Sequence, residues 1–155
     1  MKFSKLKIVN IAGWLQIIGG VVGLGLIAYL LLQTEIINGA LLLIFLTGIG
    51  LFLFSIYAGK LLCFDEVKNK GLVLTFINQL LQLLQWNVMG YGISYSAGPA
   101  VIIGVKEFAI TFNAGLFSNF SMSIRSDSPS FISINLIPLV IIIFLAVFWK
   151  KQSIP

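Results

Sequence analysis

The sequence predicts a membrane protein: an all-α bundle of four transmembrane helices, with a small extracytoplasmic antiparallel β-meander inserted between the third and fourth helices. Three observations predict this fold class. Of the 155 residues, 59% are hydrophobic and 10% are charged, whereas soluble domains are about half apolar and a quarter charged. The mean hydropathy is +1.05. The apolar residues gather in four segments, and a bilayer accepts apolar surface that a short soluble chain has no core large enough to bury.

The first three apolar segments are long enough to cross a membrane, because about 20 helical residues span a hydrocarbon layer of about 30 Å. They cover residues 8–32, 36–58 and 71–91. The first follows a basic start but ends in AYLLLQTE, without the small-residue cleavage site of a signal peptide, so we expect an uncleaved span. The fourth segment, residues 134–149, is shorter. Its Asn135 suits a helix N-cap, and Pro138 is tolerated in a first helical turn.

The basic residues predict the orientation of these spans. With four spans, one side of the membrane carries eight of them: Lys2, Lys5, Lys7, Lys60, Lys68, Lys70, Lys150 and Lys151. The other side carries Lys106 and Arg125. Cytoplasmic loops are enriched in Lys and Arg. We therefore expect a multi-pass protein of the cell (inner) membrane with cytoplasmic N- and C-termini.

The segment between the third and fourth spans, residues 92–133, changes its pattern. FAITF and FSMSI alternate apolar and other residues with a period of two, which predicts strands, and GISYSAGPAVIIGV offers two more. The alternative for AGPAVIIGV is the tail of a broken helix or a re-entrant segment. We expect an outer interaction surface built from the phenylalanines of this insert: Phe108, Phe112, Phe117, Phe120 and Phe131.

An amide seam marks the third span, within the stretch NQLLQLLQ. Helical spacing places Asn78, Gln82 and Gln85 on one face, with Gln79 beside them. An amide facing lipid would leave its donors and acceptors unpaired, so the seam should face protein or water. Candidate partners at matching depth are Gln16 in the first span and Thr47 in the second. Small residues that allow close helix packing are Gly19, Gly23, Ser55 and Gly59.

The residue inventory excludes several chemistries. The chain has no histidine and one cysteine, Cys63, so histidine-based metal, haem and acid–base sites, iron–sulfur clusters and intrachain disulfides are excluded. The predicted spans contain no ionisable residue that would form a proton relay. We expect no enzyme, no catalytic residue, no cofactor and no metal. The net charge of +5 reflects membrane topology rather than nucleic-acid binding.

The predicted organisation is three transmembrane helices at residues 1–91, a β-rich insert at 92–133, and the last helix with a short cytoplasmic tail at 134–155. Three functions are compatible with it. The first is a non-catalytic accessory subunit that meets a membrane-protein partner, or further copies of itself, within the lipid bilayer. The second is an oligomeric transport or channel component lined by the amide seam. A weaker third is an immunity-type protein against a membrane-targeting toxin. We interpret the amide seam as a set of interhelical hydrogen bonds that hold the helices together, and a ligand-binding groove or a pore are the alternatives.

Overall fold

The computed structural model describes residues 2–64, 68–116 and 118–152, and within them it has four helices and six strands. The helices are α1 (Lys2–Gln33), α2 (Gly39–Phe64), α3 (Lys68–Leu83) and α4 (Leu136–Gln152). The strands are β1 (Leu84–Val88), β2 (Tyr91–Ser96), β3 (Ala100–Lys106), β4 (Ala109–Gly115), β5 (Asn119–Ser123) and β6 (Phe131–Asn135). The predicted bundle of four transmembrane helices is therefore wrong.

Two of these helices are long and apolar enough to cross a membrane, at Val9–Gln33 within α1 and at Gly39–Phe64. They form an antiparallel hairpin whose close approach depends on small residues. A side chain at Gly13 or Gly59 would collide with the facing helix, and one at Gly23 would collide with the ring of Phe52. Small residues let helix backbones pack closely, and this hairpin uses them along much of its length.

The predicted third span, residues 71–91, ends early. The helix stops at Leu83, and the chain continues directly into β1, which pairs with both β2 and β6. The predicted fourth span changes in the same way, because β6 runs directly into α4 at Leu136. Asn135 does cap α4, since its Oδ1 accepts the amide hydrogen of Ile137 at 3.3 Å. The tertiary pairing of strands has overridden the helical pattern of the sequence.

The sheet is antiparallel throughout, with strand order β4-β3-β6-β1-β2-β5. It extends over residues 84–135, so it is larger than the predicted insert, and it is not a meander. The four strands predicted from alternation correspond to β2, β3, β4 and β5, and the helical alternative for AGPAVIIGV is wrong. β1 and β6, which occupy the middle of the sheet, were not predicted.

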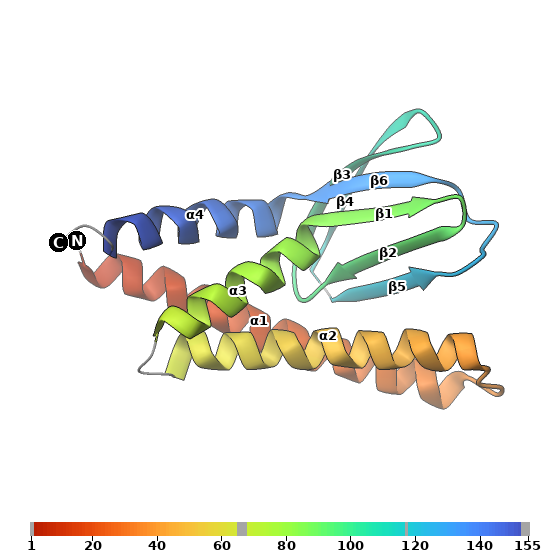
Figure 1. Ribbon diagram of the computed structural model, residues 1–155, viewed down its shortest axis with the longest axis horizontal. Coiled ribbons are helices and arrows are strands. Elements are labelled where there is room, and N and C mark those ends of the chain that lie inside the picture. Colours follow the sequence, from red (N-terminus) through yellow and green to blue (C-terminus); the bar gives the residue numbers. More distant parts are fainter. Residues whose placement is uncertain (1, 65–67, 117, 153–155) are drawn as a thin grey trace.

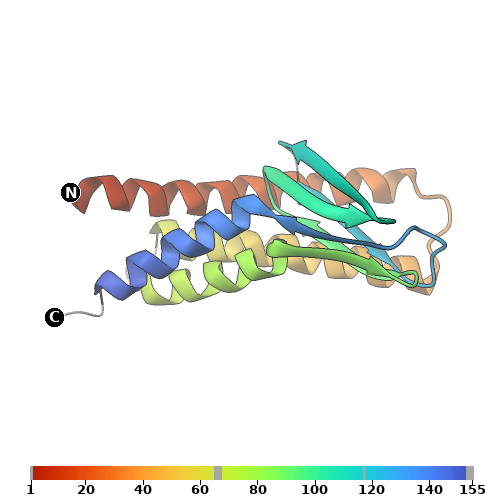
Figure 2. The same ribbon diagram turned by 90° about the horizontal axis from the view of Figure 1, so that it is seen from above.

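The molecule is elongated, with the sheet lying beside the half of the α1–α2 hairpin that contains its connection (Figure 1). The start of α1 and the end of α4 lie together at the opposite end, and α3 and α4 fill that half (Figures 1 and 2). We call the end with the α1–α2 connection the outer end and the other the inner end. A core cluster around Phe52 and Tyr95 joins helices to sheet, and one around Leu62 and Leu145 joins the helices.

Candidate functional site

A buried polar network joins α1, α2 and α3 near mid-length. Asn78 Nδ2 donates to Gln16 Oε1 at 2.8 Å and approaches Ser55 Oγ at 3.1 Å. Gln16 Nε2 donates to Thr75 Oγ1 at 3.2 Å, and the Ser55 hydroxyl donates to the Gln16 carbonyl at 3.1 Å. The Tyr95 hydroxyl adds the sheet to the network, 2.9 Å from the Leu51 carbonyl and 3.3 Å from Asn78 Oδ1. The side-chain amides of Gln16 and Asn78 therefore find hydrogen-bond partners within a single copy of the chain.

The residues of the predicted seam do not all belong to this network. Gln16 and Asn78, proposed as partners from their depth, are hydrogen bonded. Thr47 is not part of the network, because its hydroxyl bonds to the Leu43 carbonyl of its own helix. Gln85 lies on β1 rather than on a helix, and its Oε1 accepts the hydroxyl of Ser94 at 2.8 Å.

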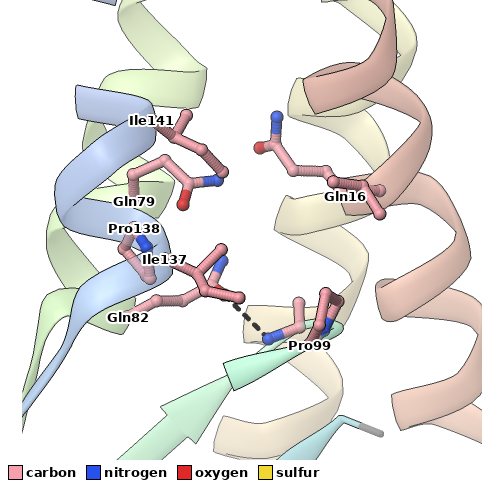
Figure 3. A pocket seen from close by; sticks show the side chains of 9 residues that line it. Gln16, Gln79, Gln82, Pro99, Ile137, Pro138 and Ile141 are labelled. Carbon is pink, nitrogen blue, oxygen red and sulfur yellow. Dashed lines mark hydrogen bonds between the residues drawn. The ribbon is translucent and has the colours of Figure 1, made fainter. Parts of the chain in front are cut away.

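The remaining seam amides border a small cavity between α1, α3 and α4 (Figure 3). Gln79 and Gln82 reach toward it from α3, with Gln16 on the α1 side (Figure 3). Gln82 Oε1 accepts the Ala97 amide at 2.8 Å, while its Nε2 has no partner among the described residues. The cavity volume is about 10 Å³, which is about the room that one water needs. It is a place for a single water rather than a conduit.

The turn at residues 97–99 docks the sheet onto α1. A side chain at Gly19 would collide with the backbone of Ala97 and Gly98, so the glycine permits a contact with the sheet rather than with α2. The Ser118 hydroxyl bridges the Gly98 amide and the Gly19 carbonyl. Gly23, Ser55 and Gly59 instead lie at the α1–α2 contact.

The sheet has its polarity reversed relative to a soluble sheet, because its polar face is the more buried one. Gln85, Asn87, Ser94, Ser133 and Asn135 are all at most 6% exposed. Side chains at Gly92 and Gly104 would collide with the neighbouring strands on this face, so small residues permit its tight coiling. The opposite face, which we call the outer apolar face, consists of Leu84, Trp86, Val88, Ile103, Val105, Ile110, Phe112, Ile132 and Ile134, each at least 36% exposed.

Comparison of the chain with protein-family models, with curated proteins and with solved structures finds no match.

The predicted aromatic surface is only partly assembled. Phe108 is fully exposed in the β3–β4 turn, and Phe112 is 68% exposed on β4. Phe120 packs inward, its ring edge to face with that of Phe52 at 6.5 Å between centroids. Phe131 is half-buried on the polar face, and Phe117 lies outside the described residues. Two of the five predicted phenylalanines thus belong to the exposed surface around β4.

β4 is an open edge of the sheet. Its hairpin with β3 pairs Lys106 with Ala109 across a two-residue turn, and both turn residues, Glu107 and Phe108, have positive φ. Such a type I′ turn is flanked by a hydrogen-bonded pair, and bonded and non-bonded pairs alternate from there. The backbone N–H and C=O groups of Ile110, Phe112 and Ala114 therefore point away from β3, toward the open side.

The usual protection of an edge strand is missing from β4. Natural edges carry charged residues or proline, or they are short. Residues 109–115, AITFNAG, contain neither charge nor proline, and the strand has seven residues. The opposite edge differs, because β5 lies against α2, with Phe120 over Gly48 (Figure 1). Alternation in AITFNAG predicts the strand, but its place at the edge follows only from the pairing of the whole sheet.

Proposed function

We propose that this protein is a non-catalytic interaction subunit of the cell membrane that holds a partner membrane protein by pairing β4 with an extended segment of that partner. The observation that carries the proposal is the open, uncharged edge of β4, with outward backbone groups at Ile110, Phe112 and Ala114. A strand added to an open edge gains affinity from main-chain hydrogen bonds and specificity from alternate side chains. Exposed Ile110 and Phe112 supply apolar contacts for that strand.

The membrane placement rests on the two long apolar helices and on the distribution of basic residues. α1 begins, α2 ends, α3 begins and α4 ends at the inner end, where eight of the ten basic residues lie in the sequence. The bias of basic residues toward the cytoplasm therefore favours an inner end that faces the cytoplasm, with both chain termini there. The chain would then cross the inner membrane more than once.

A partner other than a second copy is favoured by the direction of β4. This strand runs from the outer turn at Glu107 and Phe108 toward the inner half of the molecule (Figure 1). Two copies with the same orientation in a membrane have their β4 strands running the same way, so they cannot pair antiparallel. β5 runs the opposite way, but α2 lies along it (Figure 1). A strand of another protein that runs toward the outer end could pair antiparallel with β4, and no covered edge would be involved.

The pore alternative has no such support. Gln16 and Asn78 bond to each other, and Gln82 bonds to the Ala97 amide. Amides that hydrogen bond within one chain act as packing contacts, which average about 0.6 kcal/mol each in membrane proteins. The seam thus serves to hold the three helices and the sheet in register, and the partner surface lies elsewhere, on β4.

Paired proline variants test the proposal. Phe112→Pro removes an amide that points outward, whereas Thr111→Pro removes one that bonds to β3. We expect Phe112→Pro to fold and to lose the partner, and Thr111→Pro to lose stability. The readout is co-purification in mild detergent together with amide exchange, in which Ile110, Phe112 and Ala114 become protected when the partner binds. A folded Phe112→Pro protein that keeps its partner, or a complex mass that equals two copies of the chain, would overturn the proposal.

Cysteine labelling tests the orientation separately. In a Cys63→Ser background, Ser126→Cys places a thiol in the β5–β6 connection and Lys70→Cys places one at the inner end of α3. A membrane-impermeant maleimide should label the first in intact cells and the second only after lysis. The reverse pattern would place the termini outside.

A further inference from the structure

We infer that the outer apolar face of the sheet is immersed in lipid, so that the chain crosses the membrane with two helices and two composite rods, α3–β1 and β6–α4. The inference rests on the proposed membrane insertion and extends it to a part of the chain that the sequence placed outside the bilayer. The occupant of the outer apolar face is the acyl chains of the outer leaflet.

The lengths of α2 and of the two composite rods agree. α2 has 26 residues, so it is about 39 Å long at 1.5 Å per residue. α3 and β1 have 16 and 5 residues, which amounts to about 40 Å at 1.5 and 3.3 Å per residue. β6 and α4 have 5 and 17 residues, which amounts to about 42 Å. Each composite rod therefore has about the length of the candidate span α2, although neither α3 nor α4 reaches that length alone.

Contacts fix the depth of the sheet. Ala97 and Gly98, at the inner end of the sheet, meet Gly19 near the middle of the apolar segment of α1. Tyr95 bonds to the Leu51 carbonyl, near the middle of α2. From that level the strands run to the outer end of the hairpin (Figure 1). The sheet thus shares the depth of the outer halves of both candidate spans.

Charges are sorted to the two ends of the rods. In the sequence, residues 71–105, 109–124 and 128–149 contain no Asp, Glu, Lys or Arg. The four charges of the sheet region occupy the outer connections, with Lys106 and Glu107 at the β3–β4 turn and Arg125 and Asp127 between β5 and β6. A soluble domain would carry charges along its exposed strands. This distribution of charges is expected of a protein whose central part lies in the hydrocarbon layer of a membrane.

Large apolar side chains are exposed on both the sheet and the helices. Trp86, Ile132 and Ile134 on the sheet are exposed together with Val22 and Leu46 on the helices at similar depth. Apolar side chains are therefore exposed on both the helices and the sheet at this depth, while the polar side chains on the other face of the sheet are buried. In the same environment the outward backbone groups of β4 would cost several kcal/mol each if unpaired, which agrees with a partner strand at that edge.

Tryptophan fluorescence in reconstituted vesicles tests the inference. Variants keep one tryptophan each: Trp86 on the outer apolar face, Trp14 on α1, or Phe108→Trp at the outer turn in a Trp14→Phe, Trp86→Phe, Trp149→Phe background. Phosphatidylcholine with brominated acyl chains quenches emission in the bilayer, and iodide quenches emission in water. We expect Trp86 to be quenched by brominated lipid as strongly as Trp14 and to be shielded from iodide. The emission of the Phe108→Trp variant should be quenched by iodide.

The possible results separate the inference from the proposed insertion. If Trp14 is quenched by brominated lipid while Trp86 responds only to iodide, the helices are inserted and the sheet is not, which overturns the inference alone. If neither is quenched by brominated lipid, the proposed insertion fails as well. An additional Ile134→Trp variant, which reports from the level of Leu84, should be shielded from iodide at least as well as Trp86.

Discussion

Gln16 on α1 and Asn78 on α3 are joined by a hydrogen bond of 2.8 Å between Asn78 Nδ2 and Gln16 Oε1, although they lie 62 positions apart. Ser55 of α2 and Tyr95 of β2 approach the same asparagine. One side chain therefore connects three helices and the sheet. Its position determines how α3, and with it β1, is placed against the α1–α2 hairpin.

Replacing Asn78 should destabilise the fold. Asn78→Leu leaves Gln16, Ser55 and Tyr95 short of a partner at buried positions, so we expect the free energy of unfolding to fall by about 1–3 kcal/mol. The measurement is unfolding by a denaturing detergent in mixed micelles. Thr47→Val is the matched control, because Thr47 bonds only to its own helix, and it should change stability by no more than about 0.5 kcal/mol. If the free energy of unfolding fell equally in the two variants, the network around Asn78 would contribute no more to stability than the local hydrogen bond of Thr47.

Two glycines of α1 should respond to alanine with opposite signs. Alanine is better than glycine within a helix by up to about 1 kcal/mol. Apart from its chain neighbours and the backbone of its own helix, no described atom lies within 4 Å of a Cβ placed at Gly25, so Gly25→Ala should stabilise the protein. Gly19→Ala should destabilise it, because the new methyl group would collide with the backbone of the 97–99 turn. Thermal unfolding of both variants in the same detergent decides the matter, and stabilisation by Gly19→Ala would contradict the docking of this turn on α1.

The sequence and the structure agree best where one pattern dominates. α1 and α2 each contain an apolar run long enough to cross a membrane, so composition and length predict them. Asn135 and Pro138 mark the start of α4 correctly, and alternation locates β2 to β5. Matching depth made Gln16 a candidate partner of Asn78, and the two side chains are hydrogen bonded, whereas Thr47, a candidate on the same ground, bonds to its own helix. These features follow from local sequence and from helical rise, without knowledge of the tertiary fold.

The disagreement is concentrated at Leu84. NQLLQLLQ repeats amides at helical spacing, and no glycine or proline marks the helix end at Leu83. Yet LQWNV also alternates, with Leu84, Trp86 and Val88 apolar and Gln85 and Asn87 polar. The Met89–Gly90 turn and the alternating YGISYS follow it. Pairing with β2 and β6 decides between these patterns, and the residues of β6 lie more than 40 positions away in the sequence.

Gln82 distinguishes a packing role of the seam from a conducting one. Its Oε1 accepts the Ala97 amide, so Gln82→Leu should lower stability and speed the exchange of that amide with solvent. Gln82→Glu keeps the acceptor and should preserve the Ala97 contact better than leucine does. Amide exchange and ion flux in proteoliposomes are measured on the same preparations. Flux in the parent protein that vanishes in Gln82→Leu, with the exchange of Ala97 unchanged, would support a pore instead.

Phe108 should show a conflict between stability and binding. It has a φ of 67° and its neighbour Glu107 a φ of 48°, a left-handed conformation that costs residues other than glycine about 1 kcal/mol or more. Phe108→Gly should therefore raise the free energy of unfolding by about 1 kcal/mol. It should also weaken capture of the partner, because it removes a fully exposed aromatic ring beside β4. Glu107→Gly relieves strain in the same turn but keeps that ring, so it should stabilise the hairpin and leave capture unchanged. If Phe108→Gly were stabilised and captured the partner as well as the parent, the ring at this position would have no part in the interaction.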